Sequence, residues 1–162
     1  MSRQHLYTGK SGQLAVMAEL VSRGYNVAVP EVDIGDDIFV VRDRDGQLSR
    51  VQVKTANAKE GPMGAVVVMF SVPLRQLETP HVPDMNYVFA IRHRDSWRDF
   101  IIIGRDALYE LHSVYAVGTE VDGRVLFTIT ISDNDVLCKD RSLSTYRNQW
   151  SKWPVIDHGA SA

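Results

Sequence analysis

Two apolar runs on either side of a tight turn, residues 37–41 and 48–55, restrict the fold of this chain more than any other feature. Between them stands Asp45-Gly46, a dipeptide that favours a two-residue hairpin turn. The pattern therefore predicts a pair of antiparallel strands. In such a pair the first residues of one strand lie opposite the last residues of the other.

The second of these strands alternates between valines and polar residues. Side chains two residues apart share a face of a strand, so Val51 and Val53 are expected to face the core. Gln52 and Lys54 then point together to the opposite face. Two interpretations are open: this face is simply exposed to water, or it forms a metal-dependent site that acts on phosphodiester bonds.

Hydrophobic periodicity elsewhere predicts an α/β or α+β sheet domain, without the regular alternation of a doubly wound fold. Further strands are expected at residues 25–29, 65–70, 87–91, 100–103 and 125–131. Helices are expected at residues 11–23 and 105–112, with one short helical turn inside 71–84. Ser11 is the expected N-cap of the first helix, and Gly24 is the residue expected to end it. No internal boundary is recognised, so residues 1–162 are predicted to form a single domain.

A stripe of large apolar side chains near the C-terminus has helical spacing. It consists of Leu143, Tyr146, Trp150 and Trp153. We expect a C-terminal helix that packs this stripe into the core. Residues 155–162 are expected to be a frayed tail.

The overall composition limits the classes of function. Lys and Arg total 18 and Asp and Glu total 20, so the net charge is −2, whereas a protein that simply coats DNA is expected to be basic. Cys138 is the only cysteine, which excludes an internal disulfide and a CxxC zinc site. No run approaches the roughly 18 apolar residues of a membrane span, and no signal peptide is expected. These features favour a cytoplasmic protein without a membrane partner.

An acid, an amide and an ammonium group are predicted to meet at one edge of the sheet. Asp36 and Asp37 open the first strand of the hairpin, and Gln52 and Lys54 lie near the end of the second. Hydrolysis of a phosphodiester needs such groups, because an acidic oxygen holds the Mg²⁺ that activates water and neutralises phosphoryl charge. A lysine beside the metal can orient the water or stabilise the developing charge. The pattern alone does not separate such a site from an ordinary water-exposed hairpin.

A longer pattern surrounds these residues in the first third of the chain. It reads TGKSGQLAVMAELVSRGYNVAVPEVDIGDDIFVVRDRDGQLSRVQVKT. This stretch resembles the PD-(D/E)XK nuclease superfamily, in particular the branch with a Gln-x-Lys motif, which includes a homing endonuclease. The C-terminal YRNQWSKW also resembles the Tyr-x-x-x-Trp helix that closes several of these domains. The resemblance implies a restriction-endonuclease-like α/β fold, with a mixed central β-sheet flanked by helices.

The resemblance also implies a function and a role for each site residue. The function is that of a DNA endonuclease that depends on Mg²⁺ or Mn²⁺, and such enzymes commonly act as homo-oligomers. Asp37 matches the metal-binding acid because it directly precedes the apolar strand, and Asp36 stays open as the alternative. Gln52 stands where most of the superfamily has glutamate, and the carbonyl of Val53 would be a further metal ligand. Lys54 matches the catalytic lysine.

The first helix departs from the family pattern. The family has a glutamate directly after the position of Ser11-Gly12, and this chain has Gln13 there, bordering the site. Glu19 is no easy substitute, because six residues at about 100° each place it about 120° around the helix from position 13. Amide oxygens attract a divalent ion far less than carboxylates do. The accounts that remain are an enzyme with a weaker metal site, a degenerate nuclease-fold module that binds nucleic acid or a protein partner, and a plain interaction domain.

Overall fold

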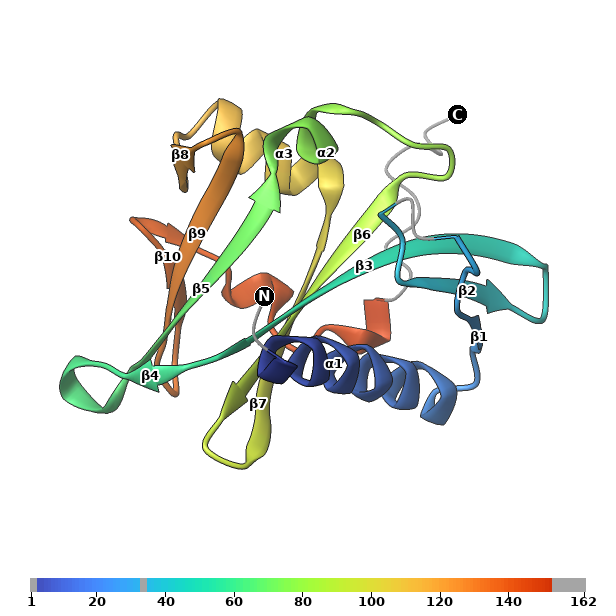
Figure 1. Ribbon diagram of the computed structural model, residues 1–162, viewed down its shortest axis with the longest axis horizontal. Helices are drawn as coiled ribbons and strands as arrows, with labels where there is room; N and C mark the ends of the chain where they lie inside the picture. Colours follow the sequence, from blue (N-terminus) through green and yellow to red (C-terminus); the bar gives the residue numbers. More distant parts are fainter. Residues whose placement is uncertain (1–2, 33–34, 153–162) are drawn as a thin grey trace.

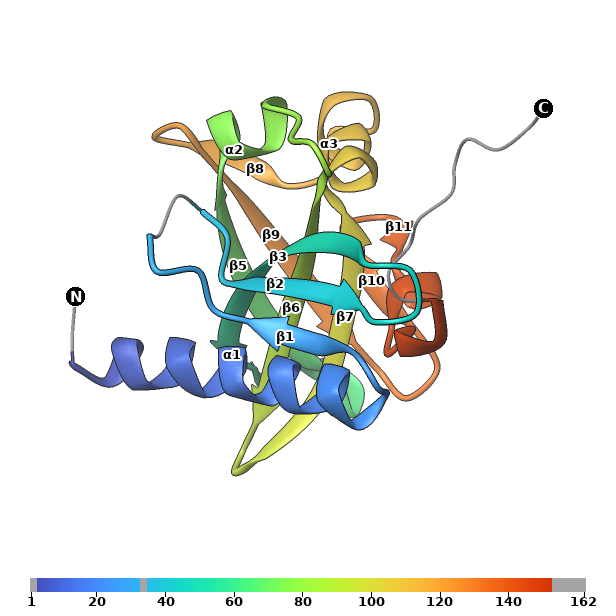
Figure 2. The ribbon, with the colours of Figure 1, turned by 90° about the vertical axis from the view of Figure 1, so that its right-hand side faces the viewer.

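The computed structural model describes residues 3–32 and 35–152, and its elements form three layers (Figures 1 and 2). A five-stranded sheet lies in the middle, between the long helix α1 (Arg3–Ser22) and a six-stranded sheet. The middle sheet has the order β1-β2-β3-β6-β7. Its strands are β1 (Asn26–Ala28), β2 (Ile38–Arg42), β3 (Gln47–Asn57), β6 (Met85–His93) and β7 (Ser96–Gly104). Strands β3 and β6 are parallel and the other neighbours are antiparallel, so this sheet is mixed, as predicted.

The hairpin of β2 and β3 forms where it was predicted, but the connection is the four residues 43–46 and not a two-residue turn, because Arg42 pairs with Gln47. Gly46 has a φ of +70°, a left-handed conformation that glycine adopts readily and other residues rarely do. The register pairs Ile38 with Val51 and Arg42 with Gln47. It therefore brings the chain just before β2 beside the middle of β3.

Helix α1 covers one face of the middle sheet. Val16 and Leu20 of the helix are fully buried and belong to the same core cluster as Val51 and Val53. The two valines of β3 thus face the core, as predicted from the alternation. Gln52 and Lys54 alternate with them and lie on the opposite face of the strand.

The ends of α1 agree only in part with the prediction. Gly24 follows the helix with a φ of +86°, and its N–H donates to the Val21 carbonyl at 2.9 Å, as expected of a residue that ends a helix. The helix begins at Arg3, however, so Ser11 is not its N-cap. The Ser11 hydroxyl instead donates to the Thr8 carbonyl at 2.8 Å within the helix.

A second, antiparallel sheet covers the face of the middle sheet opposite α1. It has the order β11-β10-β9-β5-β4, and β8 also pairs with β9. Its strands are β4 (Lys59–Glu60), β5 (Val66–Pro73), β8 (Thr119–Val121), β9 (Arg124–Ile131), β10 (Val136–Cys138) and β11 (Arg141–Ser142). Phe70 of β5 stacks on Phe89 of β6 with ring centroids 4.6 Å apart. The short strands β4, β8, β10 and β11 were not predicted.

Short helices connect the strands. Helix α2 (Leu74–Glu78) follows β5 directly, and α3 (Arg105–Ser113) follows β7 directly. Both lie at the same end of the two sheets (Figure 2). Three 3-10 turns complete the structure: η1 (Pro62–Gly64), η2 (Ser144–Tyr146) and η3 (Trp150–Lys152). In the described ranges, no helix is both long and apolar enough to cross a membrane.

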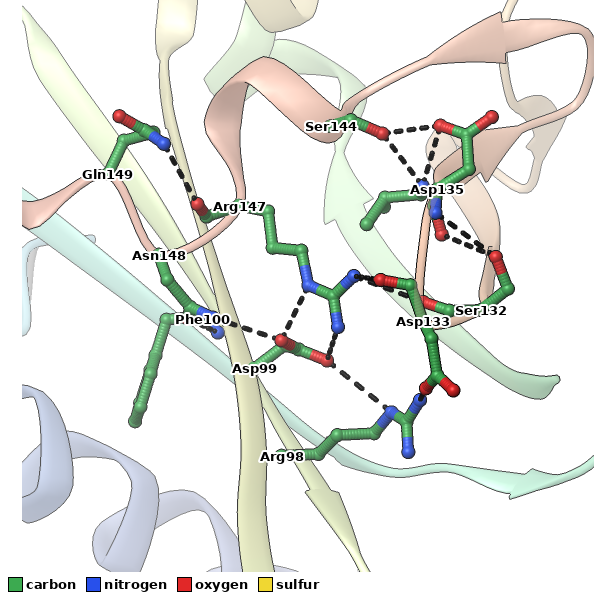
Figure 3. Close-up of polar contacts among 11 residues, drawn as sticks. Arg98, Asp99, Phe100, Ser132, Asp133, Asp135, Ser144, Arg147, Asn148 and Gln149 are labelled. Carbon is green, nitrogen blue, oxygen red and sulfur yellow. Dashed lines mark hydrogen bonds and ion pairs between the residues drawn. The ribbon is translucent and has the colours of Figure 1, made fainter. Parts of the chain in front are cut away.

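The predicted C-terminal helix is wrong for the described residues. The turns η2 and η3 are separated by a segment that binds Asp99 of β7, as Figure 3 shows. The Arg147 Nε donates to Asp99 Oδ1 at 2.8 Å, and the Asn148 side-chain amide donates to the same oxygen at 3.0 Å. Asn148 has a φ of +53°, which interrupts any helix. The bonds to a carboxylate on another strand outweigh the local helical pattern.

The apolar stripe nevertheless packs as a core element. Leu143 and Trp150 are buried, and the Trp150 ring meets Phe100 edge-on with centroids 5.3 Å apart. Trp153 and the predicted tail 155–162 lie outside the described residues. Hydrophobic burial was thus predicted correctly here, although the backbone conformation was not.

Candidate functional site

The predicted site residues lie where the chain enters β2 and crosses β3. Asp37 immediately precedes β2, and its backbone N–H donates to the Val51 carbonyl at 2.8 Å. Gln52 is only 6% exposed, and Lys54 is half-buried. The interpretation of this strand face as merely exposed to water is therefore wrong. Helix α2, which follows β5, closes over it.

The Asp37 carboxylate lies against the edge of β3. Its Oδ2 accepts hydrogen bonds from the Gln52 side-chain amide and from the Val53 backbone N–H, the latter at 2.7 Å. Residues two apart on a strand direct their backbone N–H and C=O groups toward the same neighbouring strand. Val51 and Val53 therefore both direct these groups toward β2. Strand β2 begins at Ile38 and does not reach Val53. The Asp37 side chain occupies the position beside Val53 that β2 would otherwise take. The Val53 carbonyl points to this same edge of β3.

The neighbouring carboxylate of Asp36 has a different partner. It is fully buried and is bound by the Arg50 guanidinium, with Nε to Oδ1 at 3.0 Å and Nη2 to Oδ2 at 2.5 Å. Such a two-point contact neutralises a buried charge with good geometry. Of the two acids that the sequence left open, Asp37 is the one that contacts Gln52.

Gln13 approaches the same place from α1. It is buried, and its side-chain N–H donates to the Asp37 backbone carbonyl at 2.6 Å. Its Oε1 accepts from the Lys10 ammonium at 2.7 Å. A glutamate could not donate the first of these bonds. Gln13 therefore contacts the backbone of Asp37 and fixes α1 to the segment before β2. Glu19 pairs with Arg23 on the helix surface instead.

A pocket opens on the polar face of β3, below α2. Its volume is about 500 Å³, and we call it the α2 pocket. It is lined by Gly35, Gln52, Lys54, Pro73, Arg75, Gln76, Thr79 and His81. Gln52 and Lys54 thus share one pocket, two residues apart on one strand. The residues contributed by α2 and the loop after it had not been predicted from the sequence.

Gln76 of α2 is the most closely involved of these unpredicted residues. Its side-chain N–H group donates to the Gln52 Oε1 at 3.0 Å and to the Gly35 carbonyl at 3.2 Å. These bonds fix the Gln52 amide with its nitrogen toward Asp37. The Gln76 Oε1 is buried and has no hydrogen-bond partner. The only signal in the sequence was a short turn among three prolines, which says nothing about this contact.

This part of the chain also matches a known family. Residues 3–87, which are 85 of the 162 residues, match the family model described as PD-(D/E)XK endonuclease. The chain belongs to the PD-(D/E)XK endonuclease family. The matched region contains Gln13, Asp37, Gln52 and Lys54, and the resemblance noted in the sequence is confirmed.

A solved structure shares its fold with nearly the whole chain. A bacterial homing endonuclease has a TM-score of 0.54 and 18% sequence identity to it, over 93% of this chain and 92% of that one. At this identity the similarity shows the fold alone. It confirms the predicted restriction-endonuclease-like arrangement with a mixed central sheet. No curated protein sequence matches the chain.

The atoms around Asp37 suit the divalent cation that a PD-(D/E)XK nuclease implies. They are hard oxygen donors: the Asp37 carboxylate, the Val53 carbonyl and the Gln52 amide, and Mg²⁺ and Mn²⁺ prefer such ligands. The Gln52 oxygen now faces Gln76, so the amide would have to turn to offer it. In the described parts of the chain, no group of three or more His, Cys, Asp or Glu could hold a metal ion. Neutral oxygens would therefore supply most of the ligation.

Proposed function

We propose that the protein is a DNA endonuclease that uses Mg²⁺ or Mn²⁺ to hydrolyse phosphodiester bonds. The observation that carries this proposal is the contact of Asp37 with Gln52, two residues before Lys54 on the same strand face. These residues lie in the region that matches the PD-(D/E)XK endonuclease family. An acid in contact with an amide, and an ammonium group two residues along the same strand, are groups that this hydrolysis needs.

Asp37, the Val53 carbonyl and the Gln52 amide oxygen would hold the cation. When bound, the cation would lower the pKa of a water molecule and neutralise phosphoryl charge. The Lys54 ammonium is half-buried, where a charge interacts more strongly than it does in water. It would orient the attacking water and stabilise the negative charge that grows on the phosphate. Gln13 would keep the Asp37 backbone in place from α1.

Nicking of supercoiled plasmid DNA in the presence of Mg²⁺ or Mn²⁺ tests the proposal. We expect Lys54→Ala to slow nicking by about 100-fold or more, because loss of a group that stabilises the transition state typically has an effect of this size. Lys59→Ala is the matched control, because Lys59 is exposed on β4 and pairs with Val67 near the start of β5, whereas the pocket lies at Pro73, the end of β5. Nicking that persists in Lys54→Ala, or that is equally reduced in Lys59→Ala, would contradict the proposed role of Lys54.

The alternative is a nuclease-fold module that has lost hydrolysis and binds nucleic acid or a protein partner. Amides at positions 13 and 52 favour this alternative, since Gln13 donates to a carbonyl and leaves Asp37 as the one acid of the cluster. The same plasmid assay decides between the two. A wild-type protein that does not cut, together with cutting by Gln13→Glu, would establish the degenerate account.

We also propose that the protein forms a homo-oligomer in the cytoplasm. Tyr7, Leu14 and Val21 of α1 are 68%, 54% and 55% exposed and recur every seven residues, which places them along one side of the helix. Light scattering coupled to size exclusion should give a mass above the 18.2 kDa of one chain. A single-chain mass across the concentration range would contradict this part of the proposal.

A further inference from the structure

We propose that the α2 pocket binds a backbone phosphate of the nucleic-acid strand, with Arg75 as its charged ligand. This inference rests on the proposed function, because it concerns how the same site holds its substrate. It assigns a role to α2 and to the loop that follows. Neither segment contributes to the predicted metal site.

Among the arginines from Arg23 to Arg147, Arg75 alone has a guanidinium without a hydrogen bond, ion pair or ring contact. Arginines that pair with a carboxylate are Arg23, Arg42, Arg44, Arg50, Arg92, Arg94, Arg98, Arg105 and Arg147. Arg124 bonds to Ser71, and Arg141 lies over the Tyr115 ring. Arg75 lines the pocket and is exposed there. Its charge is therefore available to an anion.

Two cationic side chains line the pocket, although the chain as a whole carries −2. Lys54 and Arg75 line it, and no lining side chain is a carboxylate. Asp84, in the following loop, is bound by the Arg105 guanidinium at 2.8 Å and so does not cancel this charge. A local cluster of cations in an acidic protein concentrates polyanions such as nucleic acid at that place. Thr79 and His81 add groups that can donate to phosphate oxygens.

The walls of the pocket are held in place without a ligand. The buried Gln52 forms its floor, and Gln76 connects this floor to the Gly35 carbonyl. Arg105 of α3 donates to the Leu77 carbonyl at 2.5 Å and thereby holds α2. A preformed site loses little conformational entropy when it binds. A phosphate could therefore enter without rearrangement of α2.

The position of the pocket specifies which phosphate it would take. Gln52 lines the pocket and also contacts Asp37, and Lys54 lines the pocket two residues further along the same strand. A phosphate on Arg75 would therefore be a near neighbour of the phosphodiester bond at Asp37, on the same strand. Arg75 would set where the strand lies, and it would read no base, because phosphate contacts position the chain and carry no sequence information.

Binding of a fluorescent DNA duplex in EDTA, measured by anisotropy at several KCl concentrations, tests the inference. We expect Arg75→Ala to lower the slope of log K against log[KCl] by about 0.9, the value for one lost phosphate contact, which is about eightfold weaker binding at 0.1 M salt. Arg75→Lys should retain most of the slope. Arg141→Ala removes the same charge on β11, outside the pocket, and should leave the slope unchanged.

The outcomes separate this inference from the proposed function. Because the assay contains no divalent metal, a wild type that never cuts DNA can still show the Arg75-dependent slope, which supports the pocket and rejects only the nuclease. If the wild type cuts DNA while Arg75→Ala binds DNA with the wild-type slope, the phosphate-binding role of the pocket is overturned and the nuclease function is not. Wild-type protein that does not bind DNA overturns the inference, and so does an equal loss in Arg141→Ala. Calorimetry with inorganic phosphate completes the test, since Arg75-dependent binding of phosphate but not of DNA would assign the pocket to a small anion.

Discussion

At the scale of single residues, the site is organised by side-chain amides. Gln13 donates to the Asp37 carbonyl, Gln52 donates to the Asp37 carboxylate, and Gln76 donates to Gln52. Each amide has both a donor and an acceptor, so a series of amides can supply hydrogen bonds to buried polar groups. A second carboxylate in the same place would repel the first. The same substitution weakens the attraction for a cation, because an amide oxygen carries no net charge.

Replacing the amide at position 52 by a carboxylate should reverse this balance. Gln52→Glu removes the donor to Asp37 and places two acids together, so we expect about 1–3 kcal/mol lower stability without metal. With Mg²⁺ the variant should gain more than the wild type in melting temperature, since a ligand that binds only the folded state stabilises it in proportion to its affinity. Thermal unfolding over a Mg²⁺ titration measures both effects.

The control for this prediction lies on the same strand. Gln47→Glu makes the same chemical change at the start of β3, opposite Arg42 and away from Asp37. It should leave the response to Mg²⁺ as in the wild type. A Gln52→Glu protein whose melting temperature rises with Mg²⁺ no more than that of Gln47→Glu would remove Gln52 from the metal site.

At the scale of elements, the close approach of α1 to β3 holds the site together. A Cβ atom added to Gly12 would lie 1.9 Å from the Thr55 Oγ1 and 2.8 Å from the Thr55 Cβ. The helix can therefore approach β3 this closely only with glycine at position 12. This closeness places Gln13 within reach of the Asp37 carbonyl.

Two glycines of α1 should respond in opposite directions to alanine. Gly9 has nothing within 4 Å of an added Cβ, so Gly9→Ala should raise stability by about 0.5–1 kcal/mol through helix propensity. Gly12→Ala gains the same propensity but must push α1 away from β3, so it should lower stability by about 1–3 kcal/mol. Urea unfolding of the two variants compares these effects. A stable Gly12→Ala protein would show that α1 and β3 are less closely packed than described.

A second element-scale contact joins α3 to the loop after α2, and its strength should depend on pH. Burial raises the pKa of Asp84, but hydrogen bonds from Arg105 and from the Met85 and His81 backbone outweigh it and hold that pKa below 3.8. A carboxyl group whose pKa is lower in the folded than in the unfolded state stabilises the folded protein at pH values above the unfolded pKa. This stabilisation is lost as pH falls through the folded pKa.

Substitution of Asp84 tests this sign. Asp84→Asn should lower the free energy of unfolding by about 1–2 kcal/mol near pH 7, because the buried Arg105 loses its counter-charge. The difference from the wild type should shrink as pH falls below about 4, where the carboxyl of the unfolded chain binds a proton, and should vanish once pH has fallen through the lower pKa of the folded protein. Chemical unfolding at several pH values provides the measurement. A difference that stayed constant down to pH 2 would mean that charge is not the cause.

At the scale of the whole molecule, one ion pair joins both sheets to the C-terminal segment (Figure 3). Asp99 of β7 is buried, with its side chain 2% exposed, and accepts from the Arg147 Nε at 2.8 Å. Arg147 also donates to the Ser132 carbonyl, just after β9, at 3.0 Å. Arg147 therefore links β7 of the middle sheet to the end of β9 in the second sheet.

Removal of this arginine should destabilise the fold as a unit. Arg147→Ala leaves Asp99 buried with Arg98 at 3.4 Å and the Asn148 amide at 3.0 Å, so we expect a loss of about 3 kcal/mol. Tryptophan fluorescence and circular dichroism should report one coincident urea transition, as expected of the single domain predicted from the sequence. Two separate transitions would contradict that prediction. The double variant Arg147→Met with Asp99→Leu should lose less than Arg147→Ala, because no buried carboxylate is left without its main partner and Arg98 keeps Asp133 at 3.6 Å.

Much of the fold could be predicted from local patterns. The β2–β3 hairpin, the alternation in β9 and the inward-facing Val51 and Val53 all depend on residues close together in the chain. The same local patterns failed at the C-terminus, where Arg147 bonds to a carboxylate 48 residues away. A long-range charge–charge contact leaves no trace in hydrophobic periodicity. The backbone there was accordingly mispredicted.

The sequence by itself determined the family, the mixed sheet and the strand that carries Gln52 and Lys54, because turn chemistry and side-chain alternation act over a few neighbouring residues. Only the tertiary structure decided that Asp37 contacts Gln52 while Asp36 is bound by Arg50. It alone brought Gln76 to Gln52 across 24 residues and left Arg75 unpaired in the same pocket. The reason is physical: such contacts depend on where α2 lies over β3, and that position is set by the packing of two whole sheets.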